Sequence, residues 1–421
     1  MGNVNVTWHK YNLFLVWCIL LLAACHPETA VPTRAVVAVV PTFTDSVLPS
    51  TWTPQPPTTL RVIAAVATLG PSLTPSITPI LPTNTPRPTA TPTPTPTIIA
   101  SPTRYVSYMP TLVPSTELGP SKLGLHVIRN NDAWINEFVR QGQPSVIKAL
   151  DDFGYVAAIK ATSPRTIVVG RFNYPIQDYG GSPEESARRF VADQLDQYLA
   201  NPAVDYWEGW NEPDPNLDNM PWYTRFEQER VRLLAQYGLR AAVGGFATGV
   251  PEMDEFELFV PAIETAIQHR GILTLHEYGA PDMTFLYGAA LPGYSPHANR
   301  GALTFRYRWY YEEILKPRGL VIPLVISEAG IDGIIGNRPG PDGYGWADFQ
   351  DYWVQQGWGS NGVEAFVNQL AWYDNGVRQD GYVIGFTIFT AGGIGHWRTY
   401  DINAILPDLT RYVVGQQFSQ Q

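Results

Sequence analysis

Two glutamates directly follow short runs of β-forming residues, and together they have the residue types for chemistry that needs a pair of carboxyl groups. Glu212 ends the segment Trp-Glu-Gly-Trp-Asn-Glu, and Glu328 follows Leu-Val-Ile-Ser. Two carboxyl groups in different surroundings can differ in pKa, so that one holds a proton to donate while the other stays ionised. Because the two residues lie far apart in the sequence, this chemistry requires a fold that brings the two segments together.

Eight short runs rich in β-branched and aromatic residues are the elements available to do this. The runs are Leu123–Val127, Ser145–Leu150, Thr166–Gly170, Tyr206–Trp210, Ala241–Gly245, Leu273–His276, Leu324–Ser327 and Ile384–Phe389. Helical periodicity fills the segments between them, as in Pro183–Leu199 after the N-cap Ser182, and in Trp222–Tyr237 before Gly238. Eight strand and helix units in roughly 300 residues predict an α/β fold, the (β/α)8 TIM barrel.

An open, doubly wound sheet is the alternative arrangement of alternating strands and helices. It would place a glycine-rich phosphate-binding loop after the first strand, but the residues there, 126–130, read His-Val-Ile-Arg-Asn. The barrel is therefore the favoured fold. In such a barrel the reactive residues lie at the carboxyl ends of the strands, where the following loops converge. Glu212 and Glu328 meet this requirement.

The sequence around the two glutamates is similar to that of a known enzyme clan. Asn-Glu-Pro follows the fourth run and Ser-Glu-Ala-Gly ends the seventh. Over residues 122–405 the chain resembles the retaining (β/α)8 glycoside hydrolases, and the resemblance implies that Glu212 is the general acid/base and Glu328 the nucleophile. Retaining hydrolysis needs the two carboxyl groups about 5 Å apart, with Glu328 kept ionised by a cation or by several hydrogen-bond donors.

Four further residues are candidates for the same site. Arg171, which directly follows the third run, is the candidate cation beside Glu328, although a surface arginine paired with another acid is an equal alternative. By the resemblance, His276 and Tyr278 contact the sugar or the nucleophile, and both point the same way because they are two residues apart. Asn211 resembles the asparagine that binds the sugar 2-hydroxyl. The alternatives are a buried histidine, a buried tyrosine and a turn or N-cap asparagine.

The eighth strand departs from the pattern of the clan. Many relatives end it with a tryptophan beneath the sugar, whereas this chain reads Phe-Thr-Ala-Gly-Gly from Phe389, and Trp397 follows as a candidate for substrate contact. Trp210 and His126, at the ends of the fourth and first runs, are further substrate-binding candidates. Lys148 in the second run could also contact substrate, but an ion pair at the bottom of the barrel is its favoured role.

Composition argues against several classes of ligand. Residues 119–421 hold 23 of the 28 Lys and Arg and 35 of the 38 Asp and Glu, a net charge of −12 without a basic cluster, which disfavours nucleic acid. Both cysteines, Cys18 and Cys25, precede this block, and no group of His and acidic residues has metal-ligand spacing. We therefore expect no metal site and no cofactor. The expected partner is a polysaccharide or oligosaccharide, bound by a monomer.

The amino terminus has the features of an exported, lipid-anchored protein. Leu13–Ala24 is an uncharged run too short to span a bilayer. It ends in Leu-Ala-Ala-Cys, which looks like the bacterial lipobox and makes Cys25 the expected site of lipidation. An ordinary secretory signal that happens to contain a cysteine is the alternative.

The segment after Cys25 is rich in proline and threonine. Half of the 38 prolines fall between Pro27 and Pro114, and proline fixes φ and lacks an amide donor, which predicts an extended, disordered tract. We therefore expect a signal peptide at 1–24, a lipid-anchored linker at 25–118 and the barrel at 119–421.

These features together predict a bacterial cell-surface glycoside hydrolase, lipid-anchored to a membrane, that cleaves O-glycosidic bonds of an extracellular polysaccharide by a retaining double displacement. One alternative is a non-catalytic carbohydrate-binding or adhesive barrel. A binding module has no need of both glutamates, so their presence favours the enzyme. Another alternative is an inverting hydrolase, in which the two carboxyl groups would lie about 6.5 to 9.5 Å apart.

Overall fold

The computed structural model describes residues 118–418, and within them eight parallel strands form a closed barrel in chain order. The strands are β1 (Leu123–Val127), β2 (Val146–Leu150), β3 (Ile167–Arg171), β4 (Tyr206–Glu208), β5 (Ala241–Phe246), β6 (Ile272–Gly279), β7 (Leu324–Ile331) and β8 (Val383–Ala391). β8 pairs with β1 and closes the barrel. The predicted (β/α)8 fold is confirmed, whereas the predicted signal peptide, Cys25 and the Pro/Thr-rich tract to residue 117 lie outside the described residues.

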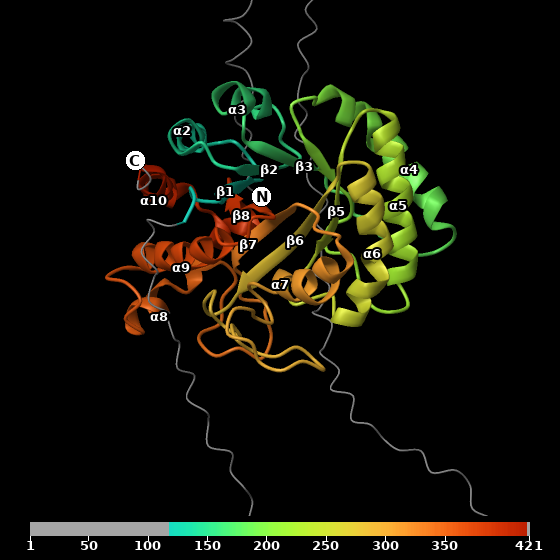
Figure 1. Ribbon diagram of the computed structural model, residues 1–421. Coiled ribbons are helices and arrows are strands. Elements are labelled where there is room, and N and C mark those ends of the chain that lie inside the picture. The colour runs from blue at the N-terminus through green and yellow to red at the C-terminus, as the bar shows by residue number, and fades with distance from the viewer. Residues whose placement is uncertain (1–117, 419–421) are drawn as a thin grey trace, which may run out of the picture. The chain divides into compact units, whose positions relative to one another are not determined.

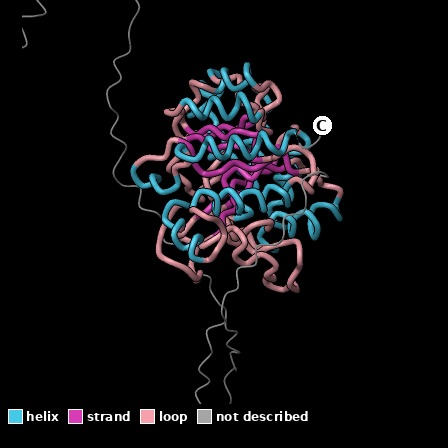
Figure 2. Tube along the Cα trace, turned by 90° about the vertical axis from the view of Figure 1, so that its left-hand side faces the viewer, coloured by secondary structure: helices cyan, strands magenta, loops and turns pink. Residues whose placement is uncertain are grey.

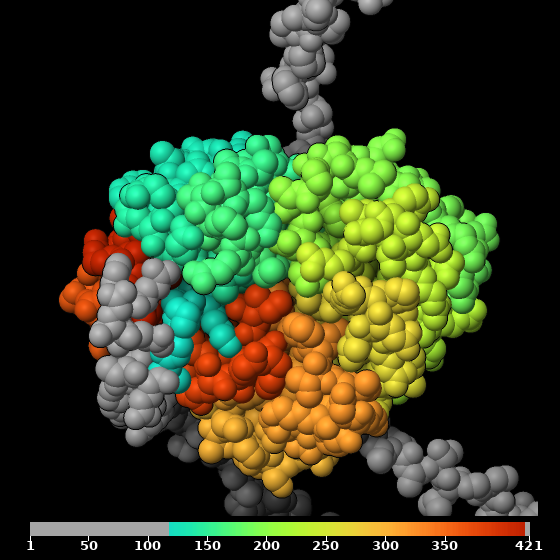
Figure 3. Space-filling view, turned by 45° about the horizontal axis from the view of Figure 1, so that its top comes forward, coloured from blue at the N-terminus to red at the C-terminus, as the bar shows by residue number. Residues whose placement is uncertain are grey.

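Helices follow the strands and surround them, as Figures 1 and 2 show. They are α2 (Ala133–Gly142), α3 (Val156–Thr162), α4 (Pro183–Ala200), α5 (Met220–Gln236), α6 (Met253–Gln268), α7 (Tyr307–Trp309), α8 (Gln350–Gln355), α9 (Gly362–Val377) and α10 (Leu406–Phe418). In Figure 3 the colours run around the visible face from teal through green, yellow and orange to red, so the last units lie beside the first. Between residues 118 and 418 no helix has the length and apolar character of a membrane span.

Local sequence signals set the ends of two of these helices. Ser182 accepts a hydrogen bond from the Glu185 amide at 3.3 Å, and Pro183 lies in the first turn, so α4 begins where the sequence predicts. After α5, Gly238 has a left-handed φ of 72°. α5 packs between α4 and α6 on the outside of the barrel (Figure 1). These helices leave the inside of the barrel to the strands alone.

The inside of the barrel is apolar near the amino ends of the strands and charged near their carboxyl ends. The apolar layer consists of Val146, Val169, Tyr206, Ala242, Ile272 and Val325. Side chains two positions apart on a strand share a face, so the next layer from β2, β3 and β4 consists of Lys148, Arg171 and Glu208. All three are buried. This charged layer lies directly below the rim on which the predicted site residues stand.

The long loop after β6, residues 280–306, is fixed to the barrel by a buried carboxylate. Glu277 accepts hydrogen bonds from the Phe305 and Tyr307 amides at 2.6 and 2.9 Å and from the Tyr373 hydroxyl at 2.6 Å. Burial raises the pKa of Glu277 to about 7, although these donors partly oppose the rise. Glu277 thus anchors the start of α7 to β6.

Candidate active site

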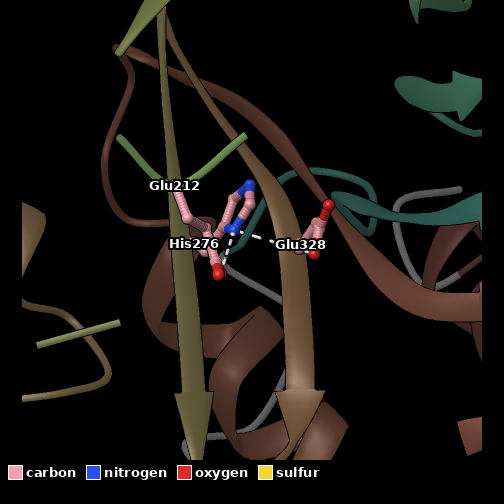
Figure 4. A group of neighbouring side chains, drawn as sticks. All are labelled: Glu212, His276 and Glu328. Carbon is pink, nitrogen blue, oxygen red and sulfur yellow. Dashed lines mark hydrogen bonds and ion pairs between the residues drawn. The ribbon is translucent and has the colours of Figure 1, made fainter. Parts of the chain in front are cut away.

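The structure brings the two sequence-predicted glutamates together at the carboxyl ends of β4 and β7. Glu328 lies within β7, whereas Glu212 lies in the loop after β4. Glu212 has a left-handed φ of 48°, and its amide donates to the Gly245 carbonyl at 2.9 Å. His276 of β6 lies beside both carboxylates in Figure 4. One polar atom from each of these three side chains lies within 4.8 Å of the other two, so the carboxylates are close enough to act on one bond.

Five polar side chains surround the carboxylate of Glu328, which is 5% exposed, and the fifth of them, His126, is described below. Oε1 lies 2.9 Å from Lys148 Nζ and 3.2 Å from Arg171 Nη1. Oε2 accepts a hydrogen bond from the Tyr278 hydroxyl at 2.8 Å and lies 3.6 Å from His276 Nδ1. Both oxygens are therefore engaged by cations or donors, and the side chain has a fixed orientation.

The ionisation of Glu328 follows from opposing effects. Burial alone would raise its pKa, but electrostatic attraction to His276, Lys148 and Arg171 outweighs burial and holds the pKa well below its usual range. Burial, and then the charge of Glu328, raise the pKa of Tyr278 well above its usual value, so the hydroxyl keeps its proton and donates it. An ionised carboxylate held in place by fixed donors is suited to act as a nucleophile.

Lys148 forms ion pairs as the favoured sequence interpretation predicts, but it lies in this cluster, and the predicted place at the bottom of the barrel is wrong. Its fully buried Nζ lies 2.8 Å from Glu208 Oε2 and 2.9 Å from Glu328 Oε1. The reason is that Val146 occupies the bottom layer, and Lys148 stands on the same face one layer higher.

Glu208 is a buried second carboxylate that the sequence analysis did not select. Burial would raise its pKa, but Lys148 and Arg171 bring the pKa down to about 2. Arg171 Nη1 lies 3.7 Å from Glu208 Oε2 and 3.2 Å from Glu328 Oε1. Two buried cations therefore balance two buried carboxylates, which offsets much of the cost of removing these charges from water.

Glu212 has more open surroundings than Glu328. Its side chain is 39% exposed, whereas that of Glu328 is 6% exposed. His276 Nδ1 lies 2.9 Å from Glu212 Oε1, and in the described part of the chain no lysine or arginine forms an ion pair with Glu212. The two carboxyl groups thus have different surroundings, because Glu212 is open to solvent whereas Glu328 is buried among cations.

Arg171 also holds Asn211 beside the two glutamates. Its Nη1 donates to Asn211 Oδ1, and the side-chain amide of Gln177 donates to the Asn211 carbonyl at 2.5 Å. Arg171 therefore links β3 both to Glu328 and to the loop that contains Glu212. The predicted contact of Asn211 with a sugar hydroxyl stays a prediction.

His126 reaches Glu328 from β1. The ring is fully buried, with Nδ1 2.8 Å from Thr390 Oγ1 and Nε2 3.6 Å from Glu328 Oε1. Burial lowers the pKa of His126 well below its usual value and outweighs the opposite effect of Glu328, so the ring is neutral. The structure places His126 at the site as a neighbour of Glu328, and its contact with substrate stays a prediction.

The two tryptophan candidates lie in different places. Trp210 is 3% exposed and packs in the core against Trp222 and Phe226 of α5, because β4 ends at Glu208 and the chain then turns outward. The structure therefore does not bring Trp210 to the carboxylates. Trp397 is half-buried, and its ring meets that of Phe389 edge-on with centroids 5.0 Å apart. Trp397 thus adjoins the β8 side of the site.

Glu212, His276 and Glu328 each offer one atom of the kind that binds a metal ion. A divalent cation there would have to approach Glu328 within the field of Lys148 and Arg171, whose nitrogens lie 2.9 and 3.2 Å from Oε1. Electrostatic repulsion by these two cations disfavours a resident metal. The residues fit proton transfer and nucleophilic attack better than metal binding.

Comparisons with known proteins add little beyond the fold. No protein-family model and no curated protein sequence matches the chain. A family 39 glycoside hydrolase from Bacteroides cellulosilyticus WH2 is similar at 15% identity and a TM-score of 0.40, covering 68% of this chain and 59% of that chain. A Faecalibacterium prausnitzii β-glucuronidase has 12% identity and a TM-score of 0.39, with 70% and 49% covered.

A third solved structure, XacCel5A in complex with cellopentaose, is similar at 13% identity and a TM-score of 0.38, covering 69% of this chain and 99% of that one. The chain spans less than two thirds of the first two structures, at 59% and 49% of their lengths. At these identities and scores the likeness does not assign an activity. The function must be argued from the geometry of the site itself.

Proposed function

We propose that this chain is a glycoside hydrolase that cleaves an O-glycosidic bond with retention of configuration, with Glu328 as the nucleophile and Glu212 as the general acid/base. The observation that supports this most directly is the distance between the two groups, since an oxygen of Glu212 and an oxygen of Glu328 lie within 4.8 Å. Double displacement needs carboxyl groups about 5 to 5.5 Å apart, whereas inversion needs about 6.5 to 9.5 Å to admit a water.

The two steps follow from the surroundings of each carboxyl group. In the first, Glu212 donates its proton to the leaving oxygen while Glu328 forms a bond to the anomeric carbon and the glycosidic C–O bond breaks. In the second, Glu212 takes a proton from a water whose oxygen attacks the same carbon, and the bond to Glu328 breaks. Lys148 and Arg171 favour the ionised nucleophile, and the Tyr278 hydroxyl orients it.

A polysaccharide is the proposed substrate because apolar side chains are exposed in the loops after β7 and β8. Ile334 and Tyr344 in the loop after β7 are 53% and 52% exposed, and Ile394 after β8 is 47% exposed. The Tyr344 ring lies 5.6 Å from that of His396. Exposed apolar groups gathered on two neighbouring loops are typical of a binding surface for a large ligand.

The proposed setting is the outer surface of a bacterial cell, with the enzyme held to a membrane by a lipid on Cys25. The Leu-Ala-Ala-Cys sequence at the end of an uncharged run supports this anchor. The proline-rich segment that follows would hold the barrel away from the membrane, since such sequences favour extended chains. A polysaccharide outside the cell would then be within reach of the site.

Azide rescue of two variants tests the mechanism. Glu328→Ala should abolish turnover of aryl glycosides, and added azide should restore only a glycosyl azide of inverted configuration. Glu212→Ala should still turn over substrates whose leaving group needs no protonation, and azide should yield a product of retained configuration. Glu264→Ala, at an exposed position on α6, is the control variant. Wild-type turnover in both active-site variants would contradict the assignment of the two glutamates.

A carbohydrate-binding barrel without turnover is the second candidate, since the exposed rim suits either role. The paired carboxylates and the buried cations around Glu328 favour the enzyme. Tight binding of glycans by a wild-type protein that hydrolyses none of a broad panel of plant, microbial and cell-wall polysaccharides would favour the binding module instead.

A further inference from the structure

A third carboxyl group lies at the rim next to the proposed catalytic pair. Asp332 directly follows the last residue of β7, and its amide donates to the Gly279 carbonyl at the end of β6 at 3.1 Å. It lies an even number of positions after Glu328, which gives the two side chains the same facing along the strand. Asp332 is therefore tied to the carboxyl ends of the two strands that contain His276 and Glu328.

Among the described residues, hydrogen bonds to the Asp332 carboxyl group reach only one of its two oxygens. Its Oδ1 accepts hydrogen bonds from the Tyr400 hydroxyl at 2.8 Å and from the Ile334 amide at 3.2 Å, and within residues 118–418 no group donates to Oδ2. The Tyr400 ring is buried and packs against the rings of Phe389 and Trp397, with centroids 5.5 and 5.4 Å away. Tyr400 thus fixes Asp332 beside the aromatic residues of the β8 side.

The charge of Asp332 is not neutralised in the way that the charges of its neighbours are. Lys148 and Arg171 form ion pairs with Glu208 and Glu328, but no lysine, arginine or histidine of the described residues forms one with Asp332. Burial chiefly, together with the charges of Glu212 and Glu328, raises the pKa of Asp332 to about 6. At neutral pH the site therefore has a fixed carboxylate with one oxygen open to a ligand donor.

We propose, on the basis of the proposed function, that Asp332, positioned by Tyr400, is a specificity-determining residue that accepts hydroxyl hydrogen bonds from a neutral sugar unit and excludes a uronic acid unit at that subsite. Sugar hydroxyls are donors that can satisfy Oδ2, and hydrogen bonds to a charged acceptor are stronger than neutral ones. A uronate would place a second anion against Asp332, near Glu212 and Glu328. Lys148 and Arg171, the two cations at the catalytic pair, already form ion pairs with Glu208 and Glu328, so neither is free to offset this repulsion.

Matched substrate pairs and Asp332→Asn test this inference. The pairs are aryl hexosides and the corresponding aryl uronides in both anomeric forms, together with neutral hexose polysaccharides before and after oxidation of their primary hydroxyls to carboxylates. For the intact wild-type chain, kcat/KM should be at least about 100-fold higher for the neutral member of a pair. Asp332→Asn should lower kcat/KM for that neutral member roughly 10- to 100-fold and reduce the preference over the uronide at least 10-fold.

Two further variants separate a specific role from a structural one. Tyr400→Phe removes the hydroxyl that holds Oδ1 and should weaken the preference less than Asp332→Asn does. Asp342→Asn makes the same charge change at an exposed position of the same loop and should leave the preference unchanged. Thermal unfolding of each variant checks that the barrel is intact.

The outcomes distinguish this inference from the proposed function. If a neutral substrate is turned over in a reaction that depends on Glu328, and Asp332→Asn leaves the preference for the neutral member unaltered, the role of Asp332 is overturned. The proposed hydrolase then stands. A wild-type preference for the uronide overturns the role of Asp332 as well. Wild-type protein that turns over neither the neutral nor the uronic member of any pair overturns both the inference and the proposed hydrolase.

Discussion

Lys148 Nζ lies 2.9 Å from Oε1 of Glu328, and the same nitrogen lies 2.8 Å from Oε2 of Glu208. Removing either carboxylate from this fully buried ammonium would cost folding free energy, because the remaining charge would be buried without compensation. The arrangement also connects β2, β4 and β7 across the inside of the barrel. Lys148 therefore both holds the proposed nucleophile in place and favours its ionised form.

Replacing Lys148 should raise the pH at which the proposed hydrolase becomes active. Glu328 has a pKa held well below its usual range, so its ionised form is lost only when the pH falls through that low value. Lys148→Met removes one cation that lowers this pKa, and the acidic limb of the kcat/KM profile should move to higher pH. The variant should also lose about 3–5 kcal/mol of folding free energy, since removing one partner of a buried pair leaves a buried charge without compensation.

Lys148→Arg is the matched variant because it keeps the charge. It should retain more activity than Lys148→Met and keep the acidic limb near its wild-type position, although the guanidinium differs in shape from the ammonium. The measurement is the pH dependence of kcat/KM for all three proteins. An acidic limb that does not move in Lys148→Met would contradict a role for Lys148 in the ionisation of Glu328.

His276 should matter most for substrates with poor leaving groups. Its Nδ1 lies 2.9 Å from Glu212 Oε1, so His276→Phe should leave the proposed acid/base without its partner. Proton donation by a positioned acid contributes typically about 10²–10⁴-fold, and part of this should be lost for aryl glycosides of basic phenols. Substrates of acidic phenols need little protonation and should be less affected. A uniform loss across leaving groups would instead indicate that His276 acts mainly on Glu328.

The barrel and the two glutamates were predictable because both depend on strong local patterns. All eight predicted runs correspond to strands, and the signal at Ser182 gives the start of α4. The runs predicted the lengths of the strands less well, since β6 and β7 extend beyond the predicted runs to Gly279 and Ile331. The ends of β6 and β7 depend on the hydrogen bonds between the two strands and on the β-bulge in their pairing. The sequence of one strand alone does not determine its register with the neighbouring strand.

Lys148 and Glu208 show why part of the site was missed. Which layer of the barrel a side chain occupies depends on the stagger between strands, which a single strand does not reveal. A signal was nevertheless present, because strands of a parallel barrel are buried on both faces and read as apolar runs. A buried lysine and a buried glutamate inside two such runs each need an oppositely charged partner. Their opposite charges therefore predict that they form an ion pair with each other. Asp332 had no such signal, since it stands in a loop.

The lipid anchor is testable without any knowledge of the substrate. Cys25→Ser should block processing of the signal segment or release the protein from membranes, because the thiol is the atom that would bear the lipid. The measurement is fractionation of cells that express the full chain, with detection of the precursor and mature sizes. Cys18→Ser, in the segment that processing would discard, is the control. A fully processed Cys25→Ser protein that stays with membranes would contradict the anchor.

Glu277 should make the folded barrel less stable as the pH rises from about 4.5 to about 7. Its pKa is raised by burial from 4.5 to about 7 in the folded state, so the native protein binds this proton more tightly than the unfolded chain does. A group of this kind contributes full stability below the unfolded pKa and loses that contribution as the pH rises through the folded pKa. Between these limits the loss is about 3 kcal/mol for a single proton.

Glu277→Gln isolates this effect because it cannot titrate. The amide places an NH2 group where either the Phe305 or the Tyr307 amide now donates, so one backbone N–H loses its acceptor and the variant should be less stable at low pH by about 1–3 kcal/mol. The free energies of urea unfolding of the two proteins should then converge as the pH rises toward 8, since only the wild type loses stability by ionising Glu277. Other titrating groups are common to both proteins and cancel in the difference. A wild-type advantage that grows with pH would show that the ionised form of Glu277 is the one that the fold prefers.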